Sequence, residues 1–95
     1  MTFRSESLRR AVASLECMRC DRVGATQAAH SNQQRDGKGM GIKASDAAIA
    51  ALCDRCHAEI DHGKSMSKEE RREAWEEAHR KTMIALLERG FLEVA

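Results

Sequence analysis

The clearest pattern of apolar and polar positions lies in the last third of the chain. Ser67 followed by Glu70 forms a capping box, and apolar residues then recur at helical spacing as far as Gly90, a residue suited to ending a helix. This pattern predicts one long helix over about 67–89 whose apolar stripe covers a small core. The stripe consists of Trp75, Ala78, Thr82, Met83 and Leu86.

The start of the chain shows the same period over a shorter span. Ser5 or Ser7 can cap a short helix whose apolar side carries Val12. Arg4 and Arg9 fall on other sides of this helix, so we expect them in solvent.

The middle of the chain is less regular. The small apolar residues of 23–30 have no helix cap and predict a short strand that ends at His30. Residues 31–43 combine glycine with lysine and arginine, which predicts a hairpin tip with a return strand over 42–44. From Ser45 or Asp46 the alanine-rich run predicts a helix through 47–52. It is interrupted by a cysteine pair and continues over 57–61, ending near residue 63.

Composition limits the size of the core. The 95 residues form one domain, and with 3% aromatic and 33% charged residues its apolar interior is modest. Such a domain gains from a metal or disulfide staple. No segment resembles a signal peptide or a membrane span, so we expect a cytoplasmic protein with no membrane partner.

Two CxxC pairs, Cys17/Cys20 and Cys53/Cys56, can supply the staple. In a reducing compartment such pairs favour zinc, with disulfides or a redox-active dithiol as the alternatives. A four-cysteine zinc site is coordinatively full and therefore structural. His57 completes a CxxCH motif of the kind that attaches c-type haem, but the first pair is followed by Asp21 and no segment resembles an export signal, so we do not expect haem.

Any reaction must then use other side chains. On a helix, His57 and Asp61 are one turn apart on the same face and together could hold magnesium or manganese. Simpler roles exist for each candidate. His57 could bond a carbonyl or a zinc-bound sulfur, His30 could be a structural histidine, and Asp46 could cap a helix.

Four segments together carry a resemblance to a known family: the CMRC run, the AAH run over Ala28–His30, the glycine-rich loop, and SDAAIAALCDRCHAEID over Ser45–Asp61. Their order and spacing resemble those of HNH endonucleases of the cysteine-bearing type, and more narrowly the YbcO-like prophage-encoded nucleases. The likeness covers about Leu8 to Gly63, and the long C-terminal helix contributes little to it.

The resemblance implies a small α+β fold with a ββα-metal core, in which zinc clamps a hairpin to a helix and further helices flank both ends. His30 would be the general base and Asp46 would orient its imidazole. His57, with Asp61 one turn later, would bind the catalytic magnesium or manganese ion. The implied function is hydrolysis of DNA phosphodiester bonds by a phage- or prophage-derived, metal-dependent endonuclease. HNH enzymes often have a metal-binding Asp or His directly before the base, and Ala29 stands there in this chain.

Charge is distributed unevenly despite a net charge of +1. Arg35, Lys38 and Lys43 lie near the proposed site and predict contact with DNA phosphates and little sequence readout, whereas glutamates crowd the later helix. A homodimer or a phage or host protein partner is also compatible with the chain. The main alternative to a nuclease is a non-catalytic zinc module that binds DNA or protein. A third alternative is a redox-active thiol protein.

Overall fold

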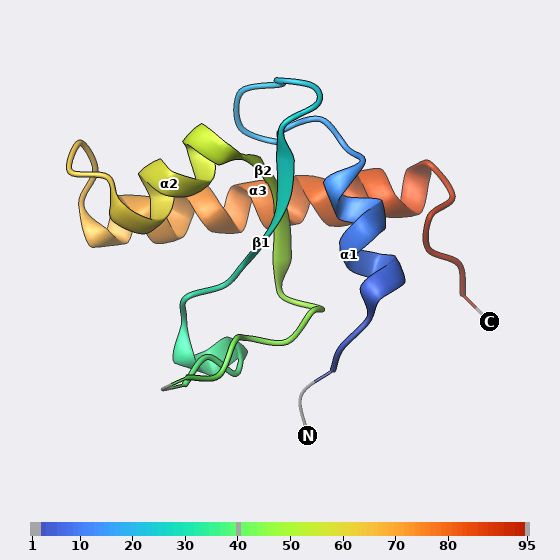
Figure 1. Ribbon diagram of the computed structural model, residues 1–95, viewed down its shortest axis with the longest axis horizontal. Coiled ribbons are helices and arrows are strands. Elements are labelled where there is room, and N and C mark those ends of the chain that lie inside the picture. The colour runs from blue at the N-terminus through green and yellow to red at the C-terminus, as the bar shows by residue number, and fades with distance from the viewer. Residues whose placement is uncertain (1–2, 40, 95) are drawn as a thin grey trace.

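The computed structural model describes residues 3–39 and 41–94. Within these residues it forms a small α+β domain with a two-stranded antiparallel sheet, as the sequence predicts. The helix α3 runs across the two strands, while α1 and α2 lie on either side of them (Figure 1). The elements are α1 (Glu6–Ala13), β1 (Thr26–His30), a 3₁₀ turn (Gln34–Asp36), β2 (Ile49–Cys53), α2 (Asp54–His62) and α3 (Lys68–Glu88).

Both terminal helices begin where their caps predict. The Ser5 hydroxyl accepts the backbone N–H of Leu8 at 3.2 Å, which starts α1. The capping box of α3 is complete, because Ser67 and Glu70 each accept the other's backbone N–H. Gly90 takes a positive φ of 80° and ends α3, as expected of a glycine at this position.

The second strand corrects two expectations. The strand β1 ends at His30 as predicted, but its partner is Ile49–Cys53, paired from Thr26↔Cys53 to His30↔Ile49. The expected return strand over 42–44 and the expected helix over 45–52 are both wrong. Between the strands, an isolated bridge joins Gly39 to Ile42.

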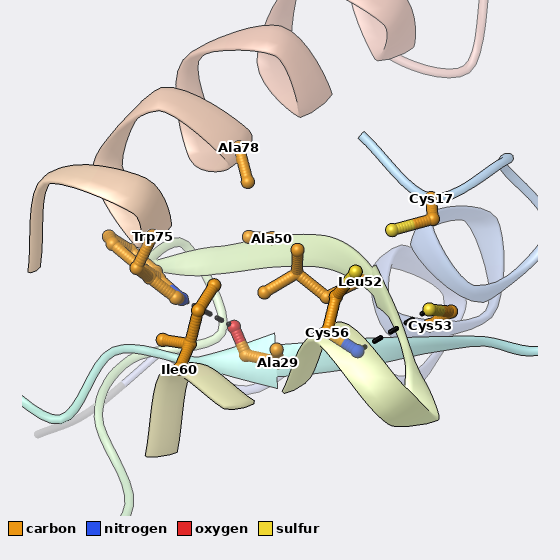
Figure 2. Packing of buried hydrophobic residues seen from close by; sticks show 9 residues of the cluster. All are labelled: Cys17, Ala29, Ala50, Leu52, Cys53, Cys56, Ile60, Trp75 and Ala78. Carbon is orange, nitrogen blue, oxygen red and sulfur yellow. Dashed lines mark hydrogen bonds between the residues drawn. The ribbon is translucent and has the colours of Figure 1, made fainter. Parts of the chain in front are cut away.

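Burial of both faces of β2 explains why the sequence pattern predicted a helix for this segment. All five residues of β2 are buried, because alternate side chains pack into two separate apolar clusters. Ala50 and Leu52 join one cluster with Trp75 and Ile60 (Figure 2), whereas Ile49 and Ala51 join another. A short continuous apolar run has no polar face, so its periodicity does not separate a buried strand from a helix.

The outer edge of β2 is bonded by groups from other elements. The N–H of Ala51 donates to the Thr82 hydroxyl at 2.9 Å, and the carbonyl of Ile49 accepts from His79 Nδ1 at 2.7 Å. The carbonyl of Ala51 accepts the backbone N–H of Met18 at 2.9 Å. These bonds dock α3 on the sheet and protect an edge that would otherwise pair with another chain.

Among residues 3–39 and 41–94, no helix combines the length and the apolar character needed to cross a bilayer.

Candidate metal centre and adjoining pocket

The four cysteines come together in space. Their sulfur atoms all lie within 4.8 Å of one another, and Sγ of Cys20 is 3.7 Å from Sγ of Cys53. Tetrahedral Zn–S bonds of about 2.3 Å place neighbouring sulfurs about 3.8 Å apart, whereas a disulfide requires about 2.05 Å. The four thiols are free and fit a tetrahedral zinc ion. No other group of three or more His, Cys, Asp or Glu ligands is found in the described part of the chain.

Each cysteine pair is positioned by a turn of the backbone. Cys17 and Cys20 occupy the turn after α1, closed by a bond from Asp21 N–H to the carbonyl of Cys17 at 2.9 Å. Cys53 ends β2 and caps α2, with its sulfur accepting the N–H of Cys56 at 3.5 Å (Figure 2). The cluster therefore ties the segment after α1 to the junction between β2 and α2.

The pKa values of Cys53 and Cys56 are shifted in opposite directions. Burial raises the pKa of Cys53, but the backbone N–H of Cys56 and the neighbouring thiols outweigh it and bring the pKa to about 6. Burial and the adjacent thiols raise the pKa of Cys56 to about 12. Although burial opposes the shift, backbone N–H groups also lower the pKa of Cys17. Metal binding would require each of the four ligands to be a thiolate.

Five of the predicted site residues line one pocket of about 230 Å³. His30 comes from the end of β1, and His57 and Asp61 come from successive turns of α2. Lys38 and Lys43 come from the loop between the strands, and neither makes an ion pair within the described residues. Residues that are far apart in sequence are therefore brought to one cavity.

The pair on α2 forms a direct contact. Nε2 of His57 lies 3.1 Å from Oδ2 of Asp61, and Nδ1 of His57 lies 2.7 Å from Oε1 of Gln27. The Asp61 carboxylate raises the pKa of His57. Burial raises the pKa of Asp61, but bonds from His57 and Asn32 outweigh it and lower the pKa. A neutral His57 could keep its proton on Nδ1, leaving Nε2 as a metal-binding nitrogen beside a carboxylate.

His30 is held by a buried carboxylate. Its Nε2 lies 2.7 Å from Oδ1 of Asp46, whose side chain is 1% exposed. Because a carboxylate accepts, Nε2 carries the proton and Nδ1 is the basic nitrogen. Asp46 does not cap a helix, and Arg4 and Arg9 are not simply in solvent. Both arginines donate to the carboxylate of Asp46, which also accepts the N–H of Ser5 at 2.7 Å.

These donors keep Asp46 ionised. Burial raises its pKa, but the bonds from His30, Ser5 and Arg9 outweigh burial and hold the pKa below the usual range. Sequence reasoning missed the parts played by Arg4 and Arg9, which lie roughly forty residues away from Asp46 along the chain. No local pattern in the sequence signals such a contact.

Ala29 and Arg35 lie outside this pocket. Ala29 is buried against Ile60 and Trp75, and its carbonyl accepts the indole N–H of Trp75 at 3.0 Å (Figure 2). Arg35 forms ion pairs with Asp36 and Glu76, which offset its charge. Contact between Arg35, Lys38 or Lys43 and DNA stays a prediction. Asn32, which the sequence did not single out, donates to Asp61 at 2.7 Å.

Comparisons of this chain with protein-family models, with curated proteins and with solved structures found no match. The arguments about function therefore depend on the residues of the site and on their geometry.

Proposed function

We propose that this protein is a zinc-clamped, metal-dependent endonuclease of the HNH type that hydrolyses phosphodiester bonds in DNA. The observation that supports it best is the shared pocket, in which a carboxylate-held His30 lies with the His57–Asp61 pair and two unpaired lysines. A base, a cation-binding pair and phosphate-binding charge are the groups that such hydrolysis needs.

In this proposal His30 is the general base. Its Nδ1 takes a proton from the water that attacks phosphorus, while Nε2–H remains bonded to Asp46. The anionic carboxylate stabilises the imidazolium that forms, and the bond from phosphorus to the 3′ oxygen breaks. The products carry a 5′-phosphate and a 3′-hydroxyl, with the leaving oxygen taking up a proton.

His57 and Asp61 would hold the catalytic cation. Their nitrogen and carboxylate fit magnesium or manganese, since such ions keep several waters and complete their shell with substrate phosphate. When bound, the cation supplies Lewis-acid stabilisation of charge on the phosphate and the leaving oxygen. The four-cysteine zinc would be structural, because its ligand set leaves no open position.

The test is cleavage of supercoiled DNA with magnesium or manganese by the wild type, His30→Ala and His57→Ala. Removing the general base His30 costs roughly 10²–10⁴-fold in rate, and removing His57 takes away a ligand of the catalytic cation, so both variants should be nearly inactive. His62→Ala is the matched control, because this exposed imidazole lines none of the pockets that contain the site residues. Activity that survives in both site variants would remove these histidines from the mechanism.

Ala29 favours a second candidate, a non-catalytic zinc module that binds DNA. With Ala29 in the core, the proposed cation site has one imidazole and one carboxylate, from His57 and Asp61, and lacks a ligand from position 29. Metal-replete protein that binds DNA tightly and never cuts it would support this alternative. A third candidate, a redox-active dithiol, would be excluded by a measurement of one zinc ion per chain with four protected thiols.

A further inference from the structure

A second pocket of about 200 Å³ adjoins the proposed catalytic pocket. Asn32 and Asp61 line both cavities, so one opens beside the other. The far side of the second pocket is formed by α3, which contributes three basic residues. These are Lys68, Arg71 and Arg72.

Helical geometry brings these three side chains together. Lys68, Arg71, Arg72 and Trp75 follow the spacing i, i+3, i+4, i+7, which places them on one face of α3. The complete capping box at Ser67 fixes where this face begins. The sequence drew attention to the many glutamates of the helix, and the basic face was missed although its spacing was readable.

The charges in this pocket are available to a ligand. Neither Lys68 nor Arg72 has a carboxylate within 4.0 Å in residues 3–39 and 41–94, whereas Arg80 and Arg89 are paired with glutamates. Arg71 is fixed by a bond to the carbonyl of Asp61 at 3.0 Å, and its buried Nε has no partner among the described residues. An unpaired, partly buried guanidinium favours an anionic ligand.

The floor of the pocket suits a phosphate better than a base. Trp75 and Ile60 are each 6% exposed, the indole N–H bonds the carbonyl of Ala29, and the indole ring stacks on His79 with centroids 5.0 Å apart. Among the described residues that line this pocket, no aromatic face is therefore free to stack on a nucleobase. The Asp61 carboxylate on the rim is already engaged by His57 and Asn32.

A pocket on the other side of His30 is less suitable. It is lined by Arg4, Arg9 and Lys43, but both arginines bond the carboxylate of Asp46. Both pockets hold three cations and one carboxylate, but Arg4 and Arg9 are already engaged by protein groups. In the α3 pocket, by contrast, neither Lys68 nor Arg72 is paired with a carboxylate among the described residues.

We propose that Lys68, Arg71 and Arg72 bind a backbone phosphate of the DNA strand next to the scissile bond. This inference rests on the proposed nuclease function, because the pocket shares Asp61 with the site of cleavage. The long helix α3 is then a part of the DNA-binding surface as well as a cover for the core. Contacts of this kind position the strand and carry no sequence information.

The test measures binding without cleavage, in a His30→Ala background and in zinc-replete, magnesium-free buffer. Affinity for a short labelled duplex is followed by fluorescence anisotropy as salt is raised. The variant Lys68→Gln/Arg72→Gln removes two pocket cations and spares Arg71, whose buried contacts support the fold. The matched control is Arg80→Gln/Lys81→Gln, with the same charge change on exposed positions of the same helix that line none of the pockets.

Weakening the contact to this one phosphate should reduce the slope of log affinity against log salt by up to about 1. The affinity deficit of the pocket variant should then be about three- to fourfold smaller at 200 mM than at 50 mM salt. The control should keep the parent slope. Equal slopes for the two double variants, or a parent that does not bind DNA, would overturn the proposal. So would tight binding of inorganic phosphate with an unchanged DNA slope.

The outcomes also separate the pocket from the chemistry. If the wild-type protein cleaves DNA and the pocket variant keeps the salt slope of its parent, phosphate binding by the α3 pocket is refuted and the proposed nuclease function stands. If the pocket variant has a reduced salt slope but the wild-type protein never cleaves DNA, the proposed nuclease function is refuted and the pocket remains a DNA-binding site.

Discussion

The Nε2 atom of His30 lies 2.7 Å from Oδ1 of Asp46, a buried carboxylate that is bonded by Arg4, Arg9 and the N–H of Ser5. The position of the His30 imidazole therefore depends, through Asp46, on residues at the start of the chain. In the proposed mechanism this contact decides which ring nitrogen is basic and keeps a negative charge beside it.

Asp46→Asn should slow DNA cleavage by roughly 10- to 100-fold, because the amide can still accept a bond from Nε2–H but no longer stabilises the imidazolium. Single-turnover cleavage measures the effect, with circular dichroism as the check on folding. A wild-type rate in a folded variant would mean that the charge of Asp46 has no part in the reaction.

The depressed pKa of Asp46 predicts a pH dependence of stability. The unfolded carboxyl titrates near pH 3.9, so below about pH 4 the unfolded state takes up a proton that the folded state resists. The stabilisation is full above this pH and is lost as the pH falls toward the lower folded pKa. Urea unfolding of wild type and Asp46→Asn should show a difference in free energy that narrows on acidification. A constant difference contradicts the prediction.

Zinc should be present at about one ion per chain, and its removal should unfold the domain, because the metal joins segments that the modest core holds weakly. Native mass spectrometry and thermal unfolding with a chelator test this. Cys20→Ser should lose the metal, whereas Arg19→Gln, an exposed residue between two ligands, should retain it. A metal-free protein of unchanged melting temperature would rule out a structural zinc.

Thr82→Val should destabilise the fold by about 1–3 kcal/mol, because the nearly isosteric valine leaves the buried N–H of Ala51 without an acceptor. Thr82→Ser keeps the hydroxyl and should lose less. Equilibrium urea denaturation gives both values. A larger loss for Thr82→Ser than for Thr82→Val would show that the methyl group, and not the hydroxyl, secures α3 to β2.

Two neighbouring alanines of β1 should respond in opposite ways to aspartate. Ala28 lines the proposed catalytic pocket, so Ala28→Asp should tighten manganese binding by about tenfold or more through an added carboxylate ligand. Ala29→Asp would bury a charge against Trp75 and Ile60 and should unfold the domain instead. Manganese titration followed by electron paramagnetic resonance, with a melting curve for each variant, distinguishes them. A stable Ala29→Asp protein with improved manganese binding would contradict the register of β1.

The cysteine spacing and the helix caps were readable from the sequence because they are local. A CxxC turn, a capping box at Ser67 and a glycine at position 90 each act within one turn of chain, and the structure has all three. The strand β2 was misread as helix because its neighbours on both faces are supplied by distant elements.

By itself, the sequence determined the two CxxC turns and the long capped α3, since these features depend on short-range hydrogen bonds. Only the tertiary structure decided where the ionisable groups meet. It buried Asp46 against Arg9, placed His30, His57 and Asp61 in one pocket, and set the basic face of α3 beside it. Such contacts depend on which segments pack together, and packing is set by burial across the whole chain.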